Sequence, residues 1–237
     1  MNLYRRLSLV ALLLAHLVPL LGCLLWGWDA GHLVLLFWFE NVVIGGYNVI
    51  KMLSLPGGGN PIKHGGKLFL VPFFMLHYGG FCAVHGMFVI LLSSGGLGSS
   101  SGNVAKTLGM NDVWGWGPLV FVGLFIQVVR HAWDMLGPEG VWGVWALVTS
   151  HGISLMLHYF LGGENQRATL SGLMMAPYAR IVVLHIAIIA AAVPVMMMGS
   201  PVALLTLLVI GKVLLDAHLH LKSHRDTPGQ TDHSPVP

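Results

Sequence analysis

Eight ionisable side chains that could bind a metal or carry protons lie in stretches of this sequence that are otherwise apolar. They are His77, His85, His151, His158, His185, His220, Asp216 and Glu40. Imidazole and carboxylate groups are the usual protein ligands of zinc and iron, and imidazole also binds copper. Because an ionisable group inside a bilayer is energetically costly, such residues mark functional sites by default. The sequence therefore predicts a metal- or proton-handling site within a membrane-embedded helical bundle.

The composition sets the class of fold that must position these residues. Of 237 residues, 55% are hydrophobic and only 9% are charged, whereas a soluble domain carries roughly 25% charged residues. We expect an all-α polytopic transmembrane bundle over residues 1–222 and a disordered polar tail over 223–237. The net charge of +3 with neutral histidines suits an oriented membrane protein in contact with anionic lipid, and we expect no nucleic-acid partner.

Transmembrane helices need about 20 consecutive apolar residues, and about seven segments of the sequence meet this length. They are 8–27, 32–53, 68–93, 117–136, 141–161, 178–199 and 202–221. A bundle of six spans remains open. The first segment follows two arginines as a signal peptide would, but it is long and no convincing cleavage site follows, so we interpret it as a retained helix.

Lysine and arginine residues in short loops indicate which side of the membrane is cytoplasmic. Those of the first half share one side: Arg5, Arg6, Lys51, Lys63 and Lys67. This pattern predicts an integral membrane protein with a cytoplasmic N-terminus. Seven spans would then place the tail on the other side, although Lys222 and Arg225 argue against that position.

Five of the candidate residues are expected at one level of the bilayer. They are Glu40, His85, His158, His185 and Asp216. With a rise of 1.5 Å per residue and alternating spans, their depths fall at roughly 18–25 Å from the inner edge. Asp216 and His220 also share a helical face, because they are four residues apart. Lys212, four residues before Asp216, could instead neutralise that carboxylate.

The leading hypothesis is a metal-dependent, hydrolase-like membrane enzyme that acts on a lipid or another apolar substrate. Zinc or iron is the expected metal, with copper as a further possibility. The expected ligands are His85, His185, Asp216 and His220, with one more from His151 or His158. The metal would lower the pKa of a bound water toward about 7. Glu40 would act as general base or additional ligand, oriented by Asn41 or Tyr47, with His77 and Lys212 in a deeper layer.

Three other interpretations of the same residues stay open. A proton-coupled or metal-ion transporter could use the histidines and carboxylates as a relay. Haem b could be held by paired histidines, for which His64 and His77 have a suitable spacing. Each polar group could also be purely structural, since buried histidines are often satisfied by hydrogen bonds. Small residues at Gly45-Gly46 and Gly79-Gly80 permit close helix contact and leave a homo-oligomer possible.

Several motifs also carry a resemblance to known sequences. They are Trp38-Phe39-Glu40-Asn41, His77-Tyr78-Gly79-Gly80-Phe81 with His85-Gly86, Ser150-His151-Gly152, Pro177-Tyr178-Ala179-Arg180-Ile181 with His185, and Lys212-x-x-x-Asp216-x-x-x-His220. In order and spacing they resemble a bacterial family of polytopic membrane proteins of unknown function. That resemblance implies a bundle of six or seven spans, a location in the bacterial inner (cytoplasmic) membrane and no assigned activity. Ser154-x-x-x-His158 and Asp216-x-x-x-His220 are also similar to parts of seven-span zinc hydrolases such as alkaline ceramidases and adiponectin receptors, but the order of elements differs, so the analogy is chemical.

Overall fold

The computed structural model describes residues 22–23, 25–56, 61–93, 117–198 and 202–223. Nearly all of these residues are helical and none of them is in a strand, which confirms the all-α prediction. Four helices in these ranges are long and apolar enough to cross a membrane: Ala30–Ser54, Gly65–Ser93, Gly117–Leu161 and Leu170–Ala191. The predicted count of seven spans is not supported. The expected first span, 8–27, and the tail lie almost wholly outside the described residues.

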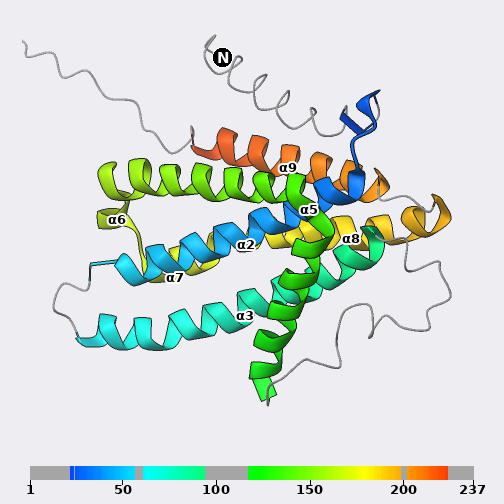
Figure 1. Ribbon diagram of the computed structural model, residues 1–237. Helices are drawn as coiled ribbons and strands as arrows, with labels where there is room; N and C mark the ends of the chain where they lie inside the picture. Colours follow the sequence, from blue (N-terminus) through cyan, green and yellow to red (C-terminus); the bar gives the residue numbers. More distant parts are fainter. Residues whose placement is uncertain (1–21, 24, 57–60, 94–116, 199–201, 224–237) are drawn as a thin grey trace, which may run out of the picture.

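The elements follow one another in a simple helical order (Figure 1). They are α2 (Ala30–Ser54), α3 (Pro61–Ser93), the 3-10 turn η2 (Gly117–Leu119), α5 (Val120–Ser154), the π-helix η3 (Leu155–Leu161), α6 (Glu164–Arg167), α7 (Leu170–Met175), α8 (Tyr178–Met198) and α9 (Val202–Ser223). The start of α2 is fixed by an N-cap, because the Asp29 carboxylate accepts a hydrogen bond from the His32 amide at 3.0 Å. Such a cap satisfies one of the amide donors left open in the first turn.

Helix α5 is bent sharply at Gly137, where φ is 60° and ψ is −175°. This backbone region is essentially restricted to glycine, and the following Pro138 both fixes its own φ and removes an amide donor. The first arm of α5 crosses the bundle, and the second arm runs along it (Figure 1). The sequence predicted two separate spans of opposite direction, over 117–136 and 141–161. That prediction was wrong, because Gly137 redirects the chain without folding it back.

Side-chain bonds establish that the second arm of α5 runs parallel to α2. The His32 ring lies 3.0 Å from the carbonyl of Met135, near the start of α2, and Tyr159 donates to the carbonyl of Lys51 at 2.7 Å, near its end. The residue numbers of the two helices therefore rise together. In Figure 1, α2, the second arm of α5 and α9 run in one direction, while α3 and α8 run in the opposite one.

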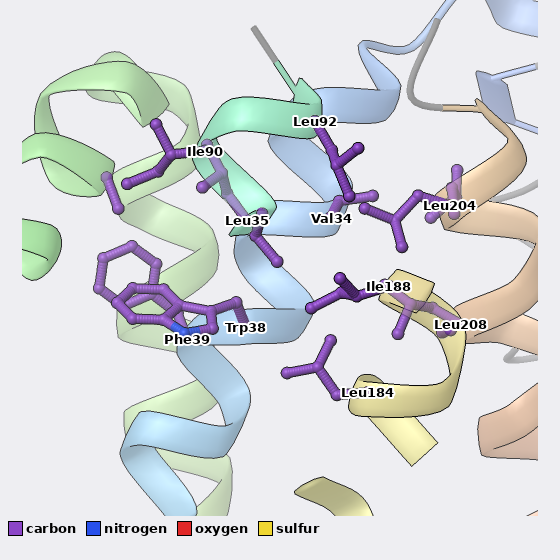
Figure 2. Close-up of a cluster of buried hydrophobic side chains, with 14 of the residues drawn as sticks. Val34, Leu35, Trp38, Phe39, Ile90, Leu92, Leu184, Ile188, Leu204 and Leu208 are labelled. Carbon is purple, nitrogen blue, oxygen red and sulfur yellow. The ribbon is translucent and has the colours of Figure 1, made fainter. Parts of the chain in front are cut away.

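The core lies where α2, α3, α8 and α9 meet (Figure 2). Trp38 of α2 is fully buried there, and its indole N–H donates to the carbonyl of Cys82 at 2.8 Å. Gly86 lets the indole approach α3, because a β-carbon at residue 86 would lie 2.5 Å from the ring. Leu184 and Leu204 close the core from α8 and α9. These contacts fix α3 against α2 at the level of His85.

Candidate functional site

Two of the predicted metal ligands, His85 of α3 and His185 of α8, are in direct contact. Nε2 of His85 lies 2.9 Å from Nδ1 of His185, and Nδ1 of His85 lies 2.7 Å from the carbonyl oxygen of Phe81. Since a carbonyl only accepts, Nδ1 of His85 carries the hydrogen and its Nε2 is the acceptor in the neutral ring. His185 then donates from Nδ1, and its own Nε2 is left with a lone pair. This order of hydrogen bonds therefore leaves Nε2 of His185 able to act as a base.

Both imidazoles lie on the wall of an apolar groove between α3 and α8, with a volume of about 930 Å³. This volume is near the upper end of the roughly 300–1,000 Å³ typical of ligand pockets. On α3 the lining extends from Phe73 to Leu92, which is about 28 Å at the helical rise. The groove therefore runs along most of a hydrocarbon layer about 30 Å thick. Phe121 of α5 closes one side of it.

A third predicted residue, His77, lines the same groove two turns before His85. Its Nδ1 lies 2.7 Å from the hydroxyl of Tyr178, and its ring stacks on Phe73 with 5.2 Å between the centroids. Tyr178 also contacts the buried Tyr78, whose hydroxyl donates to the carbonyl of Asn41 at 3.0 Å. A chain of aromatic and polar contacts thus joins the groove to α2.

Glu40 lines a separate, smaller cavity between α2, α8 and α9, where it pairs with Arg180 at 3.4 Å. The Glu40 side chain is 12% exposed and that of Arg180 is 31% exposed, so this ion pair is largely inside the bundle. Asn41 lines the same cavity, and its amide donates to the carbonyl of Phe37 at 2.9 Å. An acid inside the bundle is thus matched by a base on the neighbouring helix, as expected where charges are costly.

A third cavity, of about 180 Å³, lies between α2, the second arm of α5 and the start of α8. It is polar, and its lining includes Lys51, His151, Ser154 and Arg180. Tyr47 also lines it, and the single phenolic hydrogen of Tyr47 is used in a 2.7 Å bond to a carbonyl of α5. His151 therefore contributes to a different site from the His85–His185 pair.

Comparison with known proteins assigns the chain to a family but to no activity. A family model matches residues 2–233, nearly the whole chain. The chain belongs to DUF6498, a family of unknown function. No curated protein and no solved structure matches it. The resemblance to an uncharacterised family, inferred from the sequence motifs, is thereby confirmed, and any activity of this DUF6498 member must be inferred from its own geometry.

His158 lies far from the His85–His185 pair, contrary to the prediction that they share one level. His158 contacts the carbonyl of Ser154 at 3.2 Å, and its neighbour Tyr159 bonds to Lys51 near the end of α2. His85 lies at the level of Trp38 of α2. Trp38 precedes Lys51 by thirteen residues, so the two levels are about 20 Å apart along the helix axis. The prediction failed because it assumed that residues 141–161 run antiparallel to α2.

The predicted set of metal ligands is therefore divided among different parts of the bundle. In the parts of the chain that the structure describes, no three His, Cys, Asp or Glu side chains gather closely enough to hold a metal ion. The backbone of α9 continues past Gly211, which packs against Val183 beside the Glu40–Arg180 cavity. The side chains of Lys212, Asp216 and His220 lie outside the described ones, so the roles expected of them stay predictions.

Sequence reasoning missed two residues that this DUF6498 chain places at the centre of the arrangement, Arg180 and Tyr178. Arg180 lines two cavities and pairs with Glu40, while Tyr178 contacts His77. Both precede an apolar run, where a charged or aromatic residue is usually an interface anchor. The signal that could have identified Arg180 is the carboxylate of Glu40 deep in another span, which requires a cation at the same depth.

Proposed function

We propose that this protein is an integral membrane enzyme that holds a lipid or another apolar substrate in the groove between α3 and α8 and acts on it with His185 and His85. The observation that carries the proposal is the 2.9 Å contact between these imidazoles on the groove wall. An apolar groove within the bilayer recruits a lipid-like molecule, and two linked imidazoles add the polar chemistry that a passive lipid contact does not need.

The hydrogen-bond order of the pair supports general base catalysis. When Nε2 of His185 takes a proton from water or from a substrate hydroxyl, the imidazolium donates from Nδ1 to Nε2 of His85. His85 is held in the accepting tautomer by its bond to Phe81. The second imidazole thus orients the first and stabilises its charged form, as an orienting group does in other acid–base sites. Such a base accelerates proton transfer by roughly 10²–10⁴-fold.

A metal-dependent version of the same centre is the second candidate. Two nitrogens that bind the same tetrahedral zinc ion at about 2.0–2.1 Å lie about 3.3 Å apart, so the 2.9 Å between Nε2 of His85 and Nδ1 of His185 would have to widen slightly to admit one. The bond from His85 to Phe81 is also the kind of outer contact that orients a metal-binding histidine. Catalytic zinc takes three protein ligands, so zinc or iron here would need a further donor beside the pair.

The test is a substrate search with full-length protein in liposomes that contain a total bacterial lipid extract, with products followed by mass spectrometry. His185→Gln should reduce turnover at least about 100-fold. His158→Gln, which alters an exposed histidine at the other end of the bundle, should leave turnover unchanged. One equivalent of zinc or iron that is lost in His85→Gln/His185→Gln would select the metal version. Equal turnover in wild type and His185→Gln would refute both.

The same arrangement supports a particular orientation in the membrane. Lys51, Lys67 and Arg167 lie at or near the ends of helices at one end of the bundle, and α9 runs toward that end (Figure 1). When the expected span 8–27 is included and α5 is counted as a single span, the chain crosses the membrane six times and both termini are cytoplasmic. Lys222 and Arg225 then share the side of the other basic residues, which removes the conflict that seven spans create.

A further inference from the structure

The polar cavity between α2, the second arm of α5 and α8 has the lining of an anion site. Its volume is about 180 Å³, and its charged or ionisable lining residues are Lys51, His151 and Arg180. Hydroxyl and amide groups come from Ser154, Tyr47 and Asn48. Aspartate and glutamate are missing from the lining that the described residues form, so the side chains that face this space are cationic or neutral.

Carboxylates partner both cations from outside the cavity. Glu164 of α6 lies 3.4 Å from Lys51 and is 48% exposed, while Glu40 lies 3.4 Å from Arg180 and lines the neighbouring cavity. Charge-assisted N–H···O bonds are about 2.7–2.9 Å long when well formed, so the Lys51–Glu164 pair is loose. An ammonium group has three donors, and Glu164 uses one from Lys51. An anion in the cavity would therefore meet a Lys51 ammonium with further donors, beside the guanidinium of Arg180.

The position of the cavity along the bundle matches the headgroup region. Lys51 is three residues from the end of α2, about 5 Å along the axis. Basic pockets between transmembrane helices on the cytoplasmic side are typical sites for anionic lipid headgroups. Ser154 and Leu155, which line the cavity, also mark the change from α-helix to the π-helix η3. π-helical turns are rare and occur frequently at functional sites.

We propose that this cavity binds a phosphate group, carried either by a lipid headgroup or by a soluble phosphate compound. Lys51 and Arg180 supply the positive charge, Ser154 donates from its hydroxyl, and the His151 ring lines the same space. Nδ1 of His151 is already committed to the carbonyl of Leu147 at 3.0 Å, which fixes the ring. This site is separate from the α3–α8 groove and does not depend on the proposed chemistry there.

Binding is tested with the full chain in a neutral detergent, by thermal unfolding and native mass spectrometry. The probes are phosphatidic acid, phosphatidylglycerol, phosphatidylcholine, glycerol 3-phosphate and inorganic phosphate. Anionic probes should raise the Tm of the wild-type protein, and phosphatidylcholine should not. Lys51→Gln should raise Kd roughly 10- to 150-fold, since a hydrogen bond to a charged group contributes about 1.5–3 kcal/mol. Lys51→Gln/His151→Gln should raise it further.

Arg130→Gln is the matched control, because Arg130 is an exposed cation on the first arm of α5. Ser154→Ala removes only an exposed hydroxyl and keeps the test usable if the double variant does not fold. Saturable binding of both anionic lipid and inorganic phosphate would identify a soluble phosphate ligand, and binding of the lipid alone would identify a headgroup. No saturable binding, or equal Kd values in wild type, Lys51→Gln and Ser154→Ala, would overturn the proposal.

Discussion

Two adjacent glycines of α2, Gly45 and Gly46, should respond in opposite ways to the same substitution. A β-carbon at residue 45 would lie 2.4 Å from Cε1 of Tyr78, whereas a β-carbon at residue 46 would meet nothing within 4 Å. Tyr78 is 3% exposed and cannot swing away freely. Its ring stacks on Phe74 with 4.9 Å between centroids, and its hydroxyl is bonded to Asn41. Gly45 therefore determines how closely α2 and α3 approach.

The expected magnitude follows from these contacts. Overpacking a core costs about 1–3 kcal/mol, and displacement of the Tyr78 hydroxyl loses a hydrogen bond that contributes about 1 kcal/mol. Alanine is favoured over glycine within a helix by up to about 1 kcal/mol at either residue. Gly46→Ala should thus be neutral or stabilising, and Gly45→Ala should be less stable than Gly46→Ala by about 2–4 kcal/mol. At roughly 2–4 °C per kcal/mol, their Tm values should differ by at least about 4 °C.

The assay is thermal unfolding of both purified variants and the wild type in the same detergent, followed by intrinsic fluorescence and by the loss of monodisperse protein. In a Tyr78→Leu background the clash is relieved, so Gly45→Ala should cost much less than in the wild-type protein. This difference measures the coupling between the two residues. Equal Tm values for Gly45→Ala and Gly46→Ala, or an unchanged cost in the Tyr78→Leu background, would refute the packing that we describe.

Three further predictions concern the bend, a buried amide and the orientation. Gly137→Ala should lower stability by about 1–3 kcal/mol, because its φ and ψ are essentially restricted to glycine; an unchanged Tm would argue against the bend. Asn48→Leu should cost about 1–3 kcal/mol, because it removes the 2.7 Å bond to the carbonyl of Leu173, and hydrogen exchange of α7 should rise with it. In a protein without Cys23 and Cys82, Glu139→Cys should be labelled by a membrane-impermeant thiol reagent from the periplasmic side and Arg167→Cys from the cytoplasmic side. Labelling of both from the same side would contradict the six-span orientation.

The fold was predictable from the sequence wherever the signal was local. Apolar runs over 32–53, 68–93 and 178–199 correspond to α2, α3 and α8, and the turn residues Gly137 and Pro138 fall at the bend of α5. The direction of the chain after the bend was not predictable. Glycine followed by proline is compatible with a reversal or with a bend, and hydropathy does not distinguish a helix that crosses the bilayer from one that crosses the bundle obliquely. That single ambiguity inverted the expected depth of His158.

The candidate site was predictable to the extent that the energetic cost of placing an ionisable side chain in a bilayer identifies functional residues. His85, His185 and Glu40 were singled out because charge and imidazole are expensive in a bilayer, and the structure gives each of them a partner. Grouping by depth then failed, because depth says nothing about which side of a helix a residue occupies. Pro177, just before α8, and Arg180 of α8 line the cavity against α2 and α5, whereas His185 lines the groove against α3. Residues at similar depth can therefore line separate cavities, and only helix packing divides them.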